Sequence, residues 1–379
     1  MDLTWSPREL EFRAEARSWL AANVPGSPLP SGDTRAGFAA HLEWERALFD
    51  ARWSVVSWPE RFGGRDASLW EWLIFEEEYY RADAPQRVTQ NGIFLLAPSI
   101  FEFGTDEQQG RILPRMAAAQ DTWAQGWSEP GAGSDLAAIS SSAVRDEQRG
   151  GWRLRGQKTW TTRGAFCTHL FGLFRTDPAA VRHRGLTYFL VDLRAPGVEV
   201  RGFNRLDGDE GFAEVFFDGA FVPDSDVLGE VNHGWSVAMA TTGSERGLTL
   251  RSPGRFTRAA ERLTELARHR QVTGARNPAD RVVQSWIEAR AYQLFTLQQV
   301  TAITVGEQVG TRSSLNKLYW SELDVRLHET ALDLLEDEAE LDGTWSRGFL
   351  FSLAGPIYAG TNEIQRNIVA ERLLGLPRR

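Results

Sequence analysis

The segment Gln125-Gly126-Trp127-Ser128-Glu129-Pro130-Gly131-Ala132-Gly133-Ser134-Asp135 lies where the residue pattern of the chain changes. Before it, capping boxes at Ser6, Ser68 and Thr105 each predict the start of an α-helix. After it, short apolar runs are separated by Asp, Pro and Gly, as in a compact β-domain. Helical spacing returns after Gly234. The predicted order is therefore helical, then β, then helical.

Within the β segment, Trp152 and Leu154 alternate with arginines directly after Gly150-Gly151, which predicts a half-buried hairpin strand. The first helix is expected to stop at Pro25-Gly26, and a loop is expected between it and the helix that begins after Ser68. Further helical segments are predicted over residues 235–270, from 281 to beyond 334, and over 361–374.

Composition narrows the function classes. The 379 residues are 42% hydrophobic and carry a net charge of −9, which argues against a nucleic-acid partner. The single cysteine, Cys167, cannot form an intrachain disulfide. No secretion signal and no run of about 20 apolar residues is present, so a cytoplasmic protein without membrane insertion is expected. The six histidines are scattered without metal-ligand spacing, and no metal site is predicted.

Two segments have residue types that suit a flat ligand. Glycines and small hydroxyl residues in Gln125–Asp135 expose backbone N–H groups and permit close approach, although many such loops are only turns. The loop lacks the endings of a nucleotide P-loop and of a Rossmann fingerprint. Trp160-Thr161-Thr162 would offer a stacking surface with hydroxyl donors, which suits an isoalloxazine ring. The same tryptophan could equally be a core residue of the sheet.

Taken together, these segments resemble the acyl-CoA dehydrogenase family in order and spacing. The resemblance covers essentially the whole chain and includes the motifs at residues 104–108, 125–135, 156–162, 267–270, 358–366 and 370–376. It implies an α+β, mostly α, fold: an N-terminal α-helical domain (1–122), a central β-domain (123–232) and a C-terminal four-helix bundle (233–379). It also implies FAD between the β-domain and the bundle.

The resemblance assigns roles by position. The matching FAD contacts are Gln125, Trp127, Ser128, Ser134, Trp160, Thr162, Arg270, Thr361 and Glu363. Arg270 matches an arginine that reaches the FAD pyrophosphate. Ser134, Arg246 and Ala359 match positions near the substrate. The family's Gln-x-x-Gly-Gly stretch is absent, which leaves open how the adenine half of FAD is held.

The catalytic base departs from the commonest pattern. Many members place it as the glutamate of Tyr-Glu-Gly-Thr, where this chain has Tyr358-Ala359-Gly360-Thr361. Isovaleryl-type members instead carry the glutamate in a Glu-Arg dipeptide on a helix of the bundle, and Glu245-Arg246 matches it. Glu245 is therefore expected to remove the α-proton of the thioester. The alternative is an exposed or salt-bridged helix residue.

The implied reaction is α,β-dehydrogenation of an acyl-CoA or acyl-carrier thioester, with electrons passed to an electron-transfer flavoprotein. The departures are similar to those of bacterial members of lipid metabolism that act on bulky acyl groups such as steroid side chains. Some of these form α2β2 assemblies, so a homodimer, a homotetramer or such a heterotetramer is expected. Two alternatives remain: a relative that uses oxygen, of nitroalkane oxidase or N-hydroxylase type, and a catalytically silent partner subunit.

Overall fold

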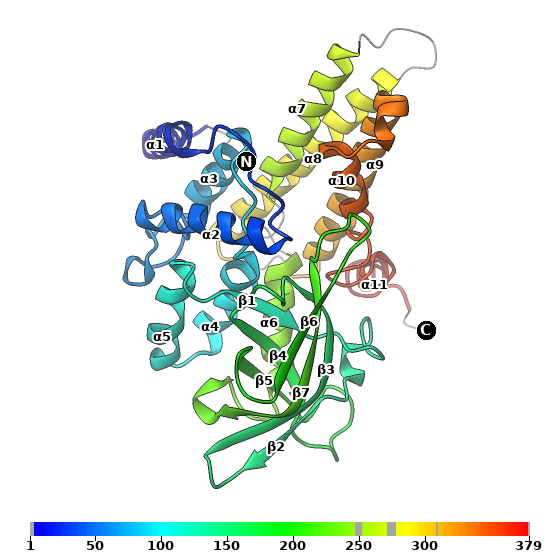
Figure 1. The fold of residues 1–379 in the computed structure, drawn as a ribbon. Coiled ribbons are helices and arrows are strands. Elements are labelled where there is room, and N and C mark those ends of the chain that lie inside the picture. The colour runs from blue at the N-terminus through cyan, green and yellow to red at the C-terminus, as the bar shows by residue number, and fades with distance from the viewer. Residues whose placement is uncertain (1–3, 247–251, 271–277, 308–309, 378–379) are drawn as a thin grey trace. The chain divides into compact units, whose positions relative to one another are not determined.

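The computed structural model describes residues 4–246, 252–270, 278–307 and 310–377 (Figure 1). The chain divides into two compact units. The helical unit comprises residues 1–25, 67–84 and 246–379, and the sheet unit comprises residues 26–66 and 85–245. The boundaries of these two units differ from the predicted domain boundaries, which stay a prediction.

The helical unit is built from helices and short helical turns. Its elements are α1 (Pro7–Asn23), α3 (Leu69–Arg81), α7 (Pro253–His269), α8 (Pro278–Thr304), α9 (Arg312–Leu335), the 3-10 turn η5 (Glu336–Glu340), α10 (Thr344–Ser352), α11 (Asn362–Ile368) and the π-helical turn η6 (Val369–Leu373). The capping boxes predicted at Ser6 and Ser68 begin α1 and α3. Phe256, Tyr292 and Trp320 form the centre of its core. Burial of these large rings is what packs α7, α8 and α9 together.

Both long helical segments predicted after residue 234 are interrupted, so their predicted lengths were wrong. The first is divided into α6 (Gly234–Arg246), in the sheet unit, and α7, which Ser252 caps. The second ends at Thr304, and α9 begins at Arg312. Gly306 and Gly310 in that connection have φ of +86° and +51°, which stops an α-helix.

The sheet unit contains several short helices and one sheet. The helical elements are α2 (Arg35–Asp50), η1 (Glu60–Phe62), η2 (Asn91–Leu96), α4 (Ala97–Phe103), α5 (Asp106–Ala117), η3 (Leu136–Ala138), η4 (Asp224–Asp226) and α6. The strands are β1 (Trp123–Gly126), β2 (Ser142–Asp146), β3 (Gly151–Thr162), β4 (His169–Arg175), β5 (Leu186–Asp192), β6 (Val198–Phe203), β7 (Phe212–Pro223) and β8 (Val227–Leu228). The helix α2 was missed because the segment was expected to be a loop; Thr34 caps it.

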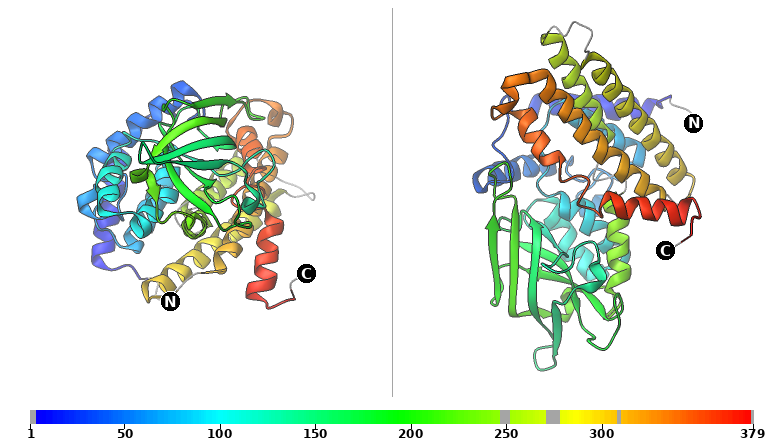
Figure 2. Two further views of the ribbon diagram at one scale, coloured as in Figure 1. Left: turned by 90° about the horizontal axis from the view of Figure 1, so that it is seen from below. Right: turned by 90° about the vertical axis from the view of Figure 1, so that its right-hand side faces the viewer.

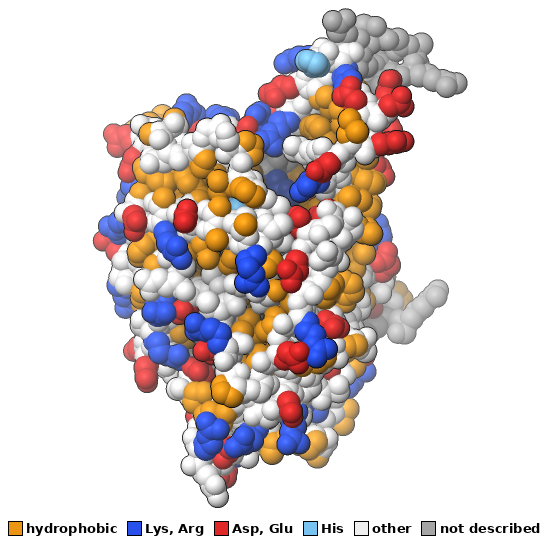
Figure 3. All heavy atoms as spheres, in the orientation of Figure 1, with side chains coloured by type: hydrophobic (Ala, Val, Ile, Leu, Met, Phe, Trp, Pro, Cys, Tyr) orange, Lys and Arg blue, Asp and Glu red, His pale blue; other side chains and the backbone are white. Residues whose placement is uncertain are grey.

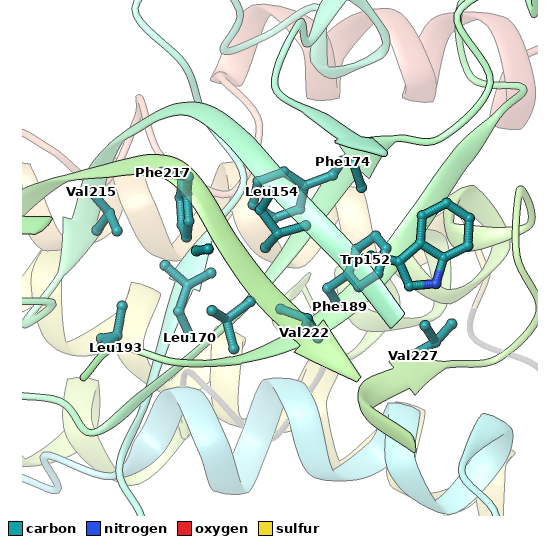
Figure 4. Packing of buried hydrophobic residues seen from close by; sticks show 13 residues of the cluster. Trp152, Leu154, Leu170, Phe174, Phe189, Leu193, Val215, Phe217, Val222 and Val227 are labelled. Atoms are coloured by element: carbon teal, nitrogen blue, oxygen red, sulfur yellow. The ribbon is translucent and has the colours of Figure 1, made fainter. Parts of the chain in front are cut away.

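Within the described residues the strands run in the order β6-β7-β3-β2-β4-β5-β8, and β1 pairs in parallel with β4. Trp152 and Leu154 are buried while Arg153 and Arg155 are exposed, which confirms the predicted alternation along β3. Figure 4 shows these two side chains with Phe174, Phe189 and other apolar residues in the core of the sheet. This core fixes which side of β3 faces outward.

Helix α6 lies against the sheet in the same unit (Figure 2). Its Thr241 hydroxyl is 2.7 Å from the Ser99 hydroxyl of α4 and 3.4 Å from the Tyr188 hydroxyl of β5. All three residues are fully buried. These polar contacts fix the rotation of α6, because an unpaired buried hydroxyl would cost free energy. No described helix is long and apolar enough to span a bilayer.

Candidate functional site

The glycine-rich loop begins at the end of β1 and runs beside β3. Gln125 is opposite Phe171 in the parallel pair β1–β4. A Cβ at Gly126 would lie 2.5 Å from Leu170, so close packing requires glycine there. The carbonyl of Ser128 accepts a hydrogen bond from the Thr159 amide at 2.9 Å. The loop and the end of β3, which the sequence analysis treated jointly, are therefore neighbours.

A buried ion pair anchors this loop to β3. Lys158 Nζ lies 2.8 Å from the Glu129 carboxylate, and both side chains are almost inaccessible. Glu129 also accepts hydrogen bonds from the Ser140 and Ser141 amides at 2.7 and 3.0 Å. Burial opposes the charge on Glu129, but Lys158 and these donors lower its pKa to about 2. Glu129 therefore links the middle of the loop to β3 and to the segment before β2.

Trp160 is turned outward by an irregularity in β3. The register with β7 shifts between Lys158 and Thr161, and Trp160 has a φ of +58°. Its side chain is 62% exposed. The rings of Phe203 and Phe212 support it edge-on, with centroids 5.4 and 5.6 Å away. A bulge re-aims a side chain in this way, and an L-residue with positive φ is held by its surroundings. Trp160 is therefore not a core residue of the sheet.

The remaining predicted residues of the sheet unit differ in exposure. Ser134 is exposed on the loop, and Thr162 is half-buried opposite Phe212 at the end of β3. Trp127 is buried, and its indole Nε1 has no hydrogen-bond partner among the described residues. A buried donor without a partner is uncommon and points to a group that the chain itself does not supply.

The expected base lies at the end of α6. Glu245 and Arg246 are the last two residues of this helix, one turn after Thr241. Their side chains lie outside the described residues. The structure therefore gives the backbone position of Glu245 on a helix, as expected, and leaves its role a prediction.

In the helical unit, the expected substrate and cofactor positions lie in the turn before α11. Ala359 and Gly360 have φ of +57° and +77°. The Gln365 amide donates to both of their carbonyls, at 3.1 and 3.2 Å, from a fully buried position. Thr361 caps α11, and its hydroxyl accepts from the Ile364 amide at 3.3 Å. Glu363 is exposed on the first turn.

Arg270 closes α7 and pairs with a carboxylate. Its guanidinium donates to both oxygens of Glu338 in η5, at 2.9 Å for Nη1. Its Nε is buried and has no partner within the part of the chain that the structure describes. The arginine predicted to reach a pyrophosphate is thus held in a bidentate ion pair, the geometry that also suits phosphate oxygens.

Two features of the site were missed from the sequence. The Lys158–Glu129 pair had a signal, because Lys158 is one of only two lysines in an arginine-rich chain. Gln365 was quoted within the terminal motif without a role. Its function depends on the turn at Ala359-Gly360, which no local pattern specifies.

The structure brings Gln125, Trp127 and Ser128 beside β3, and it brings Ala359, Thr361 and Glu363 together at α11.

Comparison with known proteins gives consistent matches along the chain. Residues 6–120 match the acyl-CoA dehydrogenase N-terminal domain, residues 124–220 the middle domain and residues 232–374 the C-terminal domain. Acyl-CoA dehydrogenase IpdE1 of Mycolicibacterium smegmatis is 41% identical over 392 aligned residues, covering 97% of this chain and 98% of the relative. The protein of the same name from Mycobacterium tuberculosis is 40% identical over 381, with the same coverage.

Solved structures agree in fold. One described as the Tcur3481-Tcur3483 steroid ACAD is 25% identical with a TM-score of 0.89 and covers 100% of both chains. The ChsE4-ChsE5 complex from Mycobacterium tuberculosis is 26% identical with a TM-score of 0.84, again over 100% of both chains.

Proposed function

The chain belongs to the acyl-CoA dehydrogenase family, and from this premise we propose that it oxidises a bulky acyl-CoA thioester to the trans-2-enoyl thioester, with FAD as hydride acceptor. The observation that carries the proposal is Trp160. It stands exposed on a bulge beside the glycine-rich loop, where a planar ring can lie against it. A steroid-type acyl group is favoured because a related solved structure is described as a steroid ACAD.

The residues of each unit suit the cofactor. In the sheet unit, Trp160 would stack on the isoalloxazine, and the Trp127 Nε1 donor lacks a partner that a ligand acceptor could supply. In the helical unit, Arg270 would bind pyrophosphate through its planar guanidinium. FAD, when bound, accepts a hydride at N5 from the β-carbon of the thioester.

The chain's own residues handle the proton. Glu245, at the end of α6, takes the α-proton. The backbone at Ala359 stabilises the thioester oxygen as negative charge develops there. Gln365 holds this turn by binding the carbonyls of Ala359 and Gly360, so the oxygen-binding geometry is set before substrate arrives.

Partners follow from the same family membership. The electrons leave to an electron-transfer flavoprotein, and the chain assembles with a second copy or with a related subunit. Large apolar side chains along one face of α8 are exposed in the single chain, namely Val283, Trp286, Ile287 and Leu294. A face of this kind is typical of a helix that another chain covers.

An anaerobic titration with acyl-CoAs of increasing bulk tests the proposal. Bleaching of the flavin absorbance near its visible maximum is expected with bulky thioesters. Glu245→Gln should abolish it, whereas Glu230→Gln, an exposed carboxylate of the same unit, should not change it. Bleaching of Glu245→Gln at the wild-type rate would rule out the base. A folded preparation without flavin, or product oxygenation on reaction with air, would rule out the dehydrogenase assignment.

A further inference from the structure

We propose that Asp33 is a positioning residue that sets the orientation of Trp160 through a buried ionic network. The inference deepens the proposed function, on which it rests for the identity of the ring that Trp160 meets. Asp33 lies in the loop before α2, far from β3 in the sequence and in the same unit. Nothing in its local sequence distinguishes it from a surface turn residue.

The Asp33 carboxylate joins two guanidinium groups. Its Oδ1 accepts from Arg163 Nε at 2.7 Å, and its Oδ2 accepts from Arg205 Nη1 at 2.7 Å. The side chains of Asp33 and Arg163 are 7% and 4% exposed. Arg205 also binds Asp207 through two hydrogen bonds, at 2.7 and 3.2 Å. One carboxylate thus connects the end of β3 to the loop between β6 and β7.

Both segments that Asp33 joins are connected to Trp160, one through the backbone and the other through ring packing. Arg163 follows Trp160 by three residues and has a φ of +55°, and its amide donates to the Gly211 carbonyl at 2.9 Å. The loop that carries Arg205 is flanked by Phe203 and Phe212, the two rings that support Trp160. The network therefore fixes the backbone that follows Trp160, and it fixes the two rings that pack against the Trp160 side chain.

The network is explained by the geometry that it imposes on its residues and not by its contribution to the free energy of folding. A buried ion pair is often no more stabilising than apolar residues of equal volume, because desolvation cancels the attraction. It does impose fixed distances and directions. Gly211 leaves room for this network, because a Cβ at that position would lie 2.6 Å from the Arg205 guanidinium. Trp160 and Arg163, both with positive φ, need surroundings of this kind to persist.

The test uses FAD-loaded protein labelled with 5-fluorotryptophan, in which Trp160→Phe assigns the fluorine NMR resonance of Trp160. Asp33→Asn should shift or broaden this resonance, change the visible circular dichroism of the flavin and weaken FAD binding by about tenfold. Glu45→Gln is the matched control, because Glu45 is another buried carboxylate of this unit paired with an arginine, Arg87, at 2.6 Å. It should leave the Trp160 resonance unchanged.

Arg205→Gln serves if Asp33→Asn does not fold. It keeps the Arg163–Asp33 pair and removes the link from Asp33 to the loop, together with the Arg205–Asp207 pair within that loop. A smaller shift of the same resonance is expected. A wild-type Trp160 resonance in the folded variants would overturn the inference. A shifted resonance with unchanged flavin dichroism and FAD affinity would support the positioning role and instead remove the flavin contact assigned to Trp160.

Discussion

Lys158 and Lys317 are the only lysines of the chain, and both side chains are fully buried. Lys158 binds Glu129 across the glycine-rich loop, and Lys317 Nζ lies 2.6 Å from the Asn362 Oδ1 at the start of α11. An ammonium is compact and donates in three directions, whereas a guanidinium is a wide planar fork. We infer that the compact ammonium suits these two buried positions.

Removal of the Glu129 charge tests the loop anchor. Glu129→Gln leaves Lys158 buried without its counter-charge, and burial, which already lowers the pKa of Lys158 to about 8, then favours the neutral amine. Loss of the buried ion pair should lower the free energy of unfolding by about 3–5 kcal/mol. Urea unfolding at pH 7 measures the change. Glu199→Gln removes an exposed carboxylate paired with Arg201 and should leave the midpoint almost unchanged. Equal midpoints for the two variants would contradict the anchoring role.

The same pair predicts sensitivity to acid. The Glu129 pKa is about 2 in the folded chain against 4.5 for the ordinary group, so the unfolded chain binds its proton more readily. Its contribution to stability is present above about pH 4.5 and is lost as the pH falls from there towards 2. The difference in urea midpoint between wild type and Glu129→Gln should therefore shrink over that interval.

At the scale of elements, the turn before α11 depends on a side chain from within the helix. Gln365 is buried and donates to the carbonyls of Ala359 and Gly360, both of which have positive φ. Positive φ disfavours alanine by roughly 1 kcal/mol or more. The turn is therefore maintained by contacts with α11 and not by local preference.

Gln365→Leu should loosen this turn while α11 remains. The loss of these two part-buried hydrogen bonds costs about 1–3 kcal/mol. Hydrogen exchange of the peptide covering residues 354–362 should become faster, with little change in a peptide from the middle of α9. Glu340→Gln, an exposed residue of η5, is the control. Unchanged exchange in residues 354–362 of the Gln365→Leu variant would show that other contacts hold the turn.

At the scale of the whole molecule, surface charges and exposed apolar side chains indicate whether the partner is a nucleic acid or another protein chain. On the face drawn in Figure 3, basic and acidic side chains are interspersed among the coloured residues, without a continuous basic stripe. This agrees with the net charge of −9 and disfavours a nucleic-acid partner. The exposed apolar side chains of α8 instead favour another protein chain.

Ile287→Arg on α8 should weaken assembly. Ile287 is 49% exposed in the single chain, and burial of an introduced guanidinium at an interface is costly. Light scattering coupled to gel filtration should show a smaller oligomer or a concentration-dependent mass. Gln148→Arg, which adds the same charge in the exposed turn between β2 and β3, should leave the mass unchanged. A wild-type mass for Ile287→Arg would exclude this face of α8 as the interface.

The sequence by itself determined the family and the order of helical and β segments, because capping boxes, strand alternation and the spacing of several motifs are local and repeated along the chain. It indicated that Trp160 could face a planar ring but could not separate that from a place in the core. Only the tertiary structure decided this, because the exposure of Trp160 follows from the bulge in β3 against β7 and from Phe203 and Phe212. The breaks between α6 and α7 and between α8 and α9, and the contacts of Gln365, involve nearby residues, but helical periodicity alone does not register them. The bridge at Asp33 depends on residues distant in sequence, and long-range contacts of that kind leave no local periodicity to recognise.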